Sequence, residues 1–139
     1  MARGPLRCLV VEDQLLLQEL LHEMLERQPG LEMVGRASSA AEAISACAVL
    51  RPDLIILDMA LPDGDGLSVA RALHVLKPEA RVIVLSSFAS TVEWPQELHH
   101  QLTAIVDKAR AFQDLIAAIQ PLLPCLAVPL GVCRTLASS

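Results

Sequence analysis

Acidic, hydroxyl and basic residues directly follow four short apolar segments of the chain. Glu12 and Asp13 come after Leu-Val-Val, and Asp58 comes after Leu-Ile-Ile-Leu. Ser86 follows Val-Ile-Val-Leu, and Lys108 follows Ile-Val-Asp. If the four segments are strands of one parallel sheet, these five side chains meet at one edge, because parallel strands all end on the same side.

The chemistry of such a cluster depends on a cation. Three carboxylates at one place repel one another unless a cation joins them, and hard oxygen ligands with room for water suit Mg²⁺. A carboxylate beside Mg²⁺, a lysine and a hydroxyl can act as the nucleophile that accepts a phosphoryl group. The metal, the lysine and the hydroxyl then stabilise the charge on the phosphoryl oxygens. The combination therefore predicts a phosphoacceptor site.

Five short apolar segments are the expected strands that position these residues. They cover residues 7–11, 31–37, 53–57, 81–85 and 103–107. Strands that are apolar throughout and alternate with helices are typical of a parallel sheet covered on both faces.

Helical periodicity of apolar residues separates the strands. The first stripe comprises Leu17, Leu20, Leu21, Met24 and Leu25, and the second comprises Ala40, Ala43, Ile44, Cys47 and Ala48 after a capping serine at 38 or 39. A third helix is expected from 66 to about 76, and a last one carries Phe112, Leu115, Ile116 and Ile119. Residues 86–101 predict a loop and a short helix, because Pro95 breaks a longer one.

The expected fold is therefore α/β: a five-stranded parallel sheet of (βα)5 flavodoxin-like, doubly wound type, with helices on both faces. The chain of 139 residues fits one domain. We expect this domain to cover residues 1–123, and residues 124–139 to be a C-terminal tail or the start of a linker.

Composition excludes several classes of function. The net charge of −5 offers no basic surface for nucleic acid, so this chain alone is not expected to bind DNA or RNA. No apolar run approaches the roughly 20 residues that span a bilayer, and the N-terminus has no signal-peptide pattern. The four cysteines form no CxxC pair, which favours reduced thiols in a cytoplasmic protein.

Four segments carry a family resemblance. The chain resembles the response-regulator receiver domain of two-component signalling over residues 6–123. The matching segments are LVVEDQ (9–14), RPDLIILDMALPDGDGL (51–67), VIVLSS (82–87) and VDKA (106–109). PGLEMVGRASSAAEAI (29–44) resembles the receiver subfamily that usually carries a helix-turn-helix output domain.

The resemblance implies a set of Mg²⁺ ligands. It implies that Asp13 binds the metal directly and that Glu12 reaches it through water. The phosphoacceptor Asp58 is implied as a further ligand, and Ala60 is implied to contribute its backbone carbonyl.

The resemblance also implies the reaction. Asp58 is implied to receive a phosphoryl group from a histidine kinase or phosphotransfer protein, with Ser86 and Lys108 contacting that group. The implied function is a signalling switch that assists its own phosphorylation and dephosphorylation, and not a metabolic enzyme. Phosphorylation is then expected to change interactions with a partner or with a second copy in a homodimer.

The chain departs from the family pattern on one face. Ile105 stands three residues before the lysine, where receivers usually have Tyr or Phe. Gln101–Leu102 replaces a usual Gly-Ala pair, and Pro95 lies where the fourth helix is expected. In receivers, the face formed by the fourth helix, the fifth strand and the fifth helix usually binds the output partner or a second copy. The response of this face to phosphorylation is therefore expected to differ here.

These departures motivate an alternative, in which the chain is a receiver-like scaffold whose interactions do not depend on phosphorylation. A flavodoxin-like cofactor binder shares the topology, but EDQLLL (12–17) stands where its phosphate loop would be. A phosphatase that forms an aspartyl-phosphate would have a second acid at position 60, which is alanine here.

The remaining polar residues receive structural interpretations. Asp63 and Asp65 are expected to shape the turn into the third helix. His99 and His100 are expected at the solvated surface, and Trp94 is expected to pack locally.

Overall fold

Aliphatic strands form a parallel sheet at the centre of the computed structural model, which describes residues 4–88 and 91–124. The strand order is β2-β1-β3-β6-β7, and all four strand pairs are parallel. The strands are β1 (Leu6–Val11), β2 (Leu31–Ala37), β3 (Leu54–Asp58), β6 (Arg81–Ser86) and β7 (Leu102–Asp107), and a small antiparallel pair joins β4 (Ala60–Leu61) to β5 (Gly64–Asp65). The predicted fold class is confirmed.

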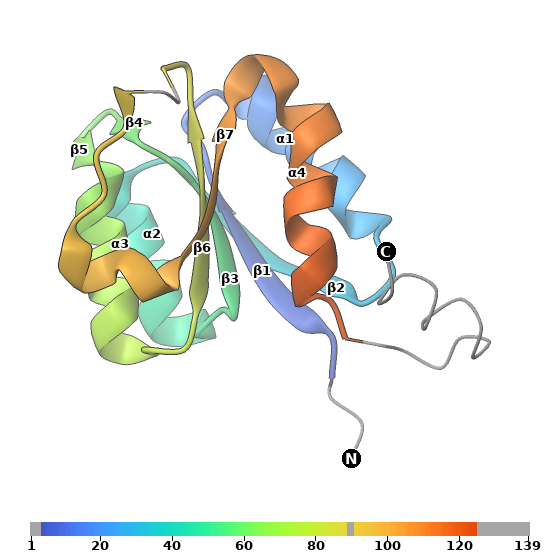
Figure 1. Cartoon of the computed structure of the whole chain (residues 1–139), viewed down its shortest axis with the longest axis horizontal. Helices are drawn as coiled ribbons and strands as arrows, with labels where there is room; N and C mark the ends of the chain where they lie inside the picture. Colours follow the sequence, from blue (N-terminus) through green and yellow to red (C-terminus); the bar gives the residue numbers. More distant parts are fainter. Residues whose placement is uncertain (1–3, 89–90, 125–139) are drawn as a thin grey trace.

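Helices cover both faces of the sheet (Figure 1). The α-helices are α1 (Leu15–Glu26), α2 (Ala40–Leu50), α3 (Gly66–Leu76) and α4 (Ala111–Ile119), and the 3₁₀ helices are η2 (Gln96–Gln101), η3 (Lys108–Arg110) and η4 (Gln120–Leu122). Helices α1 and α4 pack on one face, and α2 and α3 pack on the other with η2 beside them. Within the described ranges, no helix is long and apolar enough to cross a membrane.

The core consists of aliphatic side chains on two sides of the strands. All five residues of β3 are buried, and they alternate between the α1/α4 side and the α2/α3 side. Cys8 and Cys47 are buried free thiols. Burial raises the pKa of the Cys47 thiol to about 11 and raises the pKa of Cys8 as well, so both behave as small apolar residues.

Local signals determine where helix α2 begins and ends. Ser39 Oγ accepts a hydrogen bond from the amide of Glu42 at 3.1 Å, and Glu42 Oε1 accepts one from the amide of Ser38 at 2.9 Å. This reciprocal arrangement satisfies two backbone donors at the start of the helix. Arg51 ends it in the left-handed conformation, with φ of 46°.

Some predicted stripe positions lie on the solvent side. Leu20 is 41% exposed, Phe112 is 49% exposed and Ala48 is exposed. The face that each of these helices buries against the sheet is narrower than the stripe of apolar residues in its sequence. In helix α1 the polar Gln18 is buried instead.

Gly35 lies on a different face of β2 from the one that strict alternation predicts. The pairing of β1 with β2 shifts register between Cys8 and Leu9, so that Leu9 lies opposite Gly35. A Cβ atom at Gly35 would contact Leu50 and Leu9, on the α2 side of the sheet. The bulge therefore reverses the side on which Gly35 lies.

The connection between β6 and β7 contains the expected short helix. Pro95 occupies the N-cap position of η2, as its lack of an amide donor allows. Trp94 packs locally, and its Nε1 donates to the carbonyl of Leu98 at 2.9 Å. His99 and His100 are exposed, as predicted.

Candidate functional site

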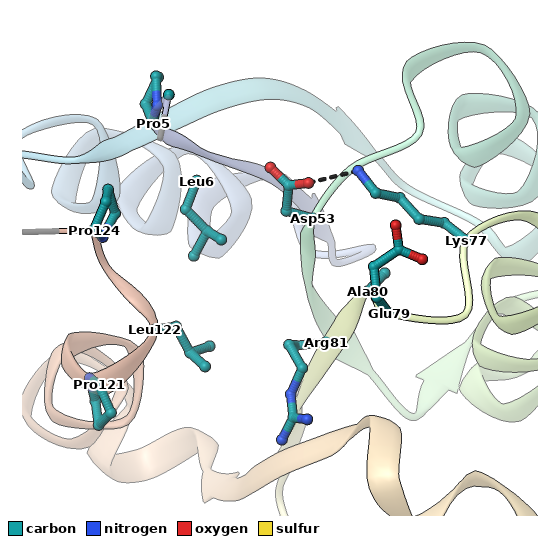
Figure 2. Close-up of a pocket in the computed structure, with 11 residues that line it drawn as sticks. Pro5, Leu6, Asp53, Lys77, Glu79, Ala80, Arg81, Pro121, Leu122 and Pro124 are labelled. Carbon is teal, nitrogen blue, oxygen red and sulfur yellow. Dashed lines mark hydrogen bonds and ion pairs between the residues drawn. The ribbon is translucent and has the colours of Figure 1, made fainter. Parts of the chain in front are cut away.

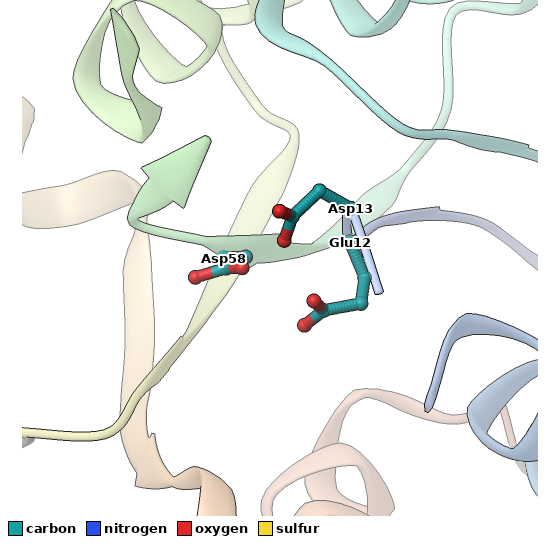
Figure 3. Close-up of side chains that lie close together, drawn as sticks. All are labelled: Glu12, Asp13 and Asp58. Carbon is teal, nitrogen blue, oxygen red and sulfur yellow. The ribbon is translucent and has the colours of Figure 1, made fainter. Parts of the chain in front are cut away.

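Three carboxylates gather at the carboxyl ends of β1 and β3 (Figure 3). Glu12 and Asp13 follow β1 directly, and Asp58 is the last residue of β3. One oxygen from each carboxylate lies within 4.8 Å of the other two. Glu12 and Asp58 are buried, with 0% and 2% exposure, and Asp13 is exposed to solvent.

Lys108 joins this cluster from the end of β7. Its Nζ lies 2.9 Å from Asp58 Oδ2 and 3.1 Å from Glu12 Oε1. Burial lowers the pKa of Lys108, but the hydrogen bonds and charges of Asp58 and Glu12 outweigh burial and raise it. The lysine is therefore held as a cation between two buried carboxylates.

Glu12 remains incompletely satisfied in this arrangement. Its Oε2 accepts a hydrogen bond from the amide of Gln14 at 3.1 Å. Its Oε1 is buried and lies near Lys108, but it has no well-directed hydrogen bond among the described residues. Burial raises the pKa of Glu12, and the neighbouring charge of Asp58 adds to that effect, while Gln14 and Lys108 oppose it.

A divalent cation fits this donor set. A buried carboxylate oxygen without a hydrogen bond carries a free-energy cost that a bound cation would remove. Carboxylate oxygens, with an exposed side left for water, are the ligands that Mg²⁺ prefers. Glu12, Asp13 and Asp58 thus have the chemistry of a magnesium site.

The two remaining predicted site residues lie at the same edge of the sheet. The amide of Ala60 donates to Asp58 Oδ1 at 3.0 Å, so it fixes the carboxylate of the acceptor. Ser86 follows Leu85, the register partner of Asp58. The Oγ atom of Ser86 accepts from the amide of Phe88 at 3.0 Å, and no hydrogen bond joins it to the acids within the described part of the chain.

Gln18 supports the cluster, although sequence reasoning did not select it. Its buried amide group donates to the carbonyl of Glu12 at 2.9 Å and to the carbonyl of Ala37 at 3.1 Å. It also donates to Ser38 Oγ at 3.2 Å. This side chain ties the ends of β1 and β2 together. The signal was a polar residue within the leucine-rich segment LLLQELL.

Gly66 supports Asp58 from behind. A Cβ atom at this position would lie 2.9 Å from the carbonyl oxygen of Asp58 and 3.0 Å from Leu57 Cγ and Met59 Sδ. The amide of Gly66 donates to the carbonyl of Met59 at 3.1 Å. Only glycine allows helix α3 to begin this close to the end of β3.

The side chain of Asp63 contacts a second helix. Its carboxylate accepts hydrogen bonds from the amides of Ala40 and Ala41, at 2.7 Å and 2.9 Å, at the start of α2. These bonds lower the pKa of Asp63. Asp63 lies in the turn that precedes α3, as expected, and its side chain also binds the start of α2, because the start of α2 lies beside the β4–β5 loop in the fold.

Comparisons with known proteins agree with this geometry. The family model described as "Response regulator receiver domain" matches residues 8–120. A protein-glutamate methylesterase/protein-glutamine glutaminase of Myxococcus xanthus is 41% identical over 84 residues, which are 60% of this chain and 24% of that protein. The DNA-binding transcriptional activator DevR/DosR of Mycobacterium tuberculosis is 37% identical over 81 residues, which are 58% of this chain and 37% of that protein.

A solved structure extends the agreement to the fold. The response regulator TrrA of Thermotoga maritima, in complex with Mg²⁺ and BeF, is 30% identical and superposes with a TM-score of 0.68. The match covers 84% of this chain and 98% of that one. The match thus spans nearly the whole chain of that solved structure, but only 24% and 37% of the length of the two curated relatives above.

Proposed function

Because the chain belongs to the response-regulator receiver family, we propose that it accepts a phosphoryl group on Asp58 in a two-component phosphorelay. The observation that carries this proposal is the position of Asp58. It is buried at the end of β3, 2.9 Å from Lys108, with Glu12 and Asp13 beside it. A nucleophilic carboxylate between a cation and a metal-binding acid pair suits phosphoryl transfer.

The residues have separate roles in the proposed reaction. A carboxylate oxygen of Asp58 attacks phosphorus while the bond from phosphorus to the donor nitrogen breaks. The resulting acyl phosphate remains on Asp58. Lys108 neutralises the added charge, and the amide of Ala60 holds the carboxylate in place. The hydroxyl of Ser86 would have to leave the amide of Phe88 to reach the phosphoryl group.

The proposed metal is Mg²⁺. Bound at the acids, it would neutralise charge on the phosphoryl oxygens during transfer. We assign Glu12, Asp13 and Asp58 as its side-chain ligands and the backbone carbonyl of Ala60 as a further one. The buried Glu12 Oε1, which has no well-directed hydrogen bond, supports this assignment.

The proposed phosphodonor is a histidine kinase or a phosphotransfer protein. Leu15 and Leu16 follow the acid pair at the start of α1, and they are 66% and 71% exposed. Large apolar side chains beside a reactive site favour a protein partner over a small molecule. The chain is then a signalling switch that assists its own phosphorylation and dephosphorylation.

The response to phosphorylation would not use an aromatic side chain three residues before Lys108, where receivers usually have one. Ile105 is half-buried and packs with the core on the α2/α3 side, so no ring is available there to change position. Lys108 connects the site directly to the end of β7, which makes this strand the proposed route to the output surface. Phosphorylation would shift the population between two states with different affinity for a partner.

The proposed receiver covers residues 1–123, and residues 124–139 are proposed as a tail or linker start. The match covers only a small part of the length of the curated relatives. This small share is consistent with a receiver that belongs to a longer regulator with a separate output domain. We also propose a cytoplasmic location, because Cys8 and Cys47 are free thiols, as is usual in reducing compartments.

Intact-mass measurement after incubation with acetyl phosphate and Mg²⁺ tests the function. The wild type should gain one phosphate, and Asp58→Asn should gain none. Asp53→Asn is the matched control, since Asp53 precedes the other end of β3 and pairs with Lys77. Size-exclusion chromatography of the same samples reports any change in assembly. A wild type that stays unmodified, with donor and metal present, would overturn the proposal.

A further inference from the structure

Two histidines from distant segments lie against each other between α3 and η2. The ring centres of His74 and His100 are 5.1 Å apart, and the ring planes meet at 67°. His74 belongs to α3 and is half-buried, whereas His100 belongs to η2 and is exposed. The sequence placed His100 only at the solvated surface, because its partner comes from another element. The fold thus brings two imidazoles together at the edge of the core.

The backbone on both sides of this pair is held in place. Gln101, which follows His100, is buried, and its Nε2 donates to the carbonyl of Ala70 in α3 at 3.0 Å. Arg81 donates to the carbonyl of His100 at 2.7 Å. Leu98 is buried in the core cluster that contains the apolar side of α3. The two imidazoles therefore extend from backbone segments with fixed relative positions, as a binding site requires.

A carboxylate lies beside the pair of histidines. Glu97 accepts a hydrogen bond from Arg71 Nη1 at 3.0 Å, and this ion pair also joins η2 to α3. Arg71 precedes His74 by three residues of an α-helix and so shares its face. Glu97 precedes His100 by three residues of a 3₁₀ helix, in which such side chains eclipse each other. The side chains of the ion pair are 52% and 62% exposed, so it contributes little and Glu97 can exchange Arg71 for another cation.

One nitrogen of His74 has no hydrogen-bond partner. Its Nδ1 is buried and forms no hydrogen bond within residues 4–88 and 91–124, and the same holds for Gln101 Oε1. A buried polar atom without a partner costs free energy, and in folded proteins such atoms usually bind water or an ion. Ring packing alone would account for the distance between the two imidazoles, but it leaves this nitrogen unsatisfied.

We propose that His74, His100 and Glu97 bind a Zn²⁺ ion between α3 and η2. Two imidazoles on one tetrahedral ion have ring centres roughly 5 Å apart, because each Zn–N bond is about 2.1 Å long. The two rings already have this separation, at 5.1 Å, so the helices need not move to admit the ion. Glu97 would leave Arg71 and supply an oxygen ligand, with water in the fourth position.

This site differs chemically from the acid cluster at the ends of β1 and β3. Imidazole nitrogens favour Zn²⁺, whereas carboxylates and water favour Mg²⁺. The zinc ion would cross-link η2, in the connection between β6 and β7, to α3. Its binding requires neither phosphorylation of Asp58 nor the proposed magnesium ligands. Zinc binding and phosphorylation can therefore be measured independently, and the failure of one leaves the other intact.

Isothermal titration calorimetry with Zn²⁺ tests the site on unphosphorylated protein. The reference protein carries Cys125→Ser and Cys133→Ser, because thiols compete for zinc, and excess Mg²⁺ is present to occupy the acid cluster. His74→Gln and His100→Gln should each weaken zinc binding at least about tenfold, since even the loss of an outer-shell partner has an effect of that size. Glu97→Gln, which removes only a charge, should weaken binding by a smaller factor.

The two other histidines provide matched controls. His99→Gln removes the exposed imidazole next to His100 on η2. His22→Gln removes an imidazole of α1 that lies 3.8 Å from the carboxylate of Glu26. Both variants should bind zinc like the reference protein, because neither histidine belongs to the pair. Circular dichroism verifies that each variant is folded.

Histidine-selective NMR of the reference protein gives a test that needs no change at the site. Zn²⁺ should shift the imidazole signals of His74 and His100 and leave those of His22 and His99 unchanged. A reference protein that does not bind zinc would overturn the proposal. So would unchanged binding by both His74→Gln and His100→Gln, shifts confined to the other two histidines, or an equal loss of binding in His99→Gln.

Discussion

Lys108 Nζ lies 2.9 Å from Asp58 Oδ2, although the two residues are 50 positions apart in the sequence. The same nitrogen lies 3.1 Å from the buried Glu12 Oε1. One cation thus holds together the ends of β1, β3 and β7. The contact is structural before any phosphoryl group arrives, and it connects the acceptor to the strand at the edge of the sheet.

Replacing Lys108 by methionine should therefore destabilise the protein. In the absence of Mg²⁺, the change leaves Asp58 and Glu12 buried without a cation, which should lower the free energy of unfolding by about 3 kcal/mol. Urea unfolding measures the effect. The double variant Asp58→Asn/Lys108→Met should recover part of the loss, because one buried charge is gone. Equal stability of the wild type and Lys108→Met would contradict the assigned ion pair.

Mg²⁺ should stabilise the wild type through the acid cluster. At about 100 times the dissociation constant, the gain in unfolding free energy should be about 2.7 kcal/mol. Asp13→Asn should lose most of this gain in a thermal-unfolding experiment with and without the metal. Glu19→Gln, which alters an exposed acid of α1 outside the cluster, should keep it. If Asp13→Asn responds to Mg²⁺ like the wild type, Asp13 is not a ligand.

Gly66→Ala should disturb the acceptor without removing any carboxylate of the cluster. The new methyl group would lie 2.9 Å from the carbonyl oxygen of Asp58, so the end of β3 must move. We expect a loss of about 1–3 kcal/mol of stability and slower phosphorylation by acetyl phosphate. Gly4→Ala is the matched control, because nothing lies within 4 Å of its added methyl group. Equal effects of the two substitutions would refute this role for Gly66.

Asp53 should contribute to the acid dependence of stability. Burial alone would raise its pKa, but the Lys77 ammonium at 2.5 Å and the Arg7 amide at 2.9 Å outweigh burial and lower it. Lys77, Asp53 and Arg81 line an open groove at the opposite end of the sheet from the acid cluster (Figure 2).

A lowered pKa in the folded state means that the unfolded chain binds the proton more readily. The stabilisation from Asp53 is therefore present above the pKa of the unfolded carboxyl and is lost as the pH falls through the folded pKa. Asp53→Asn should cost up to about 1 kcal/mol at pH 7 and little at the acid end. Urea unfolding across this pH range measures the difference. A constant difference would show that the carboxylate charge is not the cause.

The sequence alone determined the order of strands and helices and the residues at the strand ends. The element order could be predicted because buried parallel strands are continuous apolar runs and because glycine, proline and serine mark where elements begin and end. Asp58, Glu12, Asp13 and Lys108 could be selected since each lies within two residues of the end of such a run. The short helix between β6 and β7 was also predicted, because proline excludes a longer one for a local reason.

The tertiary structure decided what depends on contacts between distant segments. Gln18 ties two strands together, Asp63 binds the start of α2, and Gly66 allows α3 to begin beside Asp58. The partners in these contacts could not be identified from the sequence, because they meet only when the elements pack together. The bulge in β2 moved Gly35 to the other face, because register depends on the neighbouring strand. The position of β7 at the edge of the sheet could likewise be recognised only once the strands were assembled, since an edge is a property of the sheet and not of the strand.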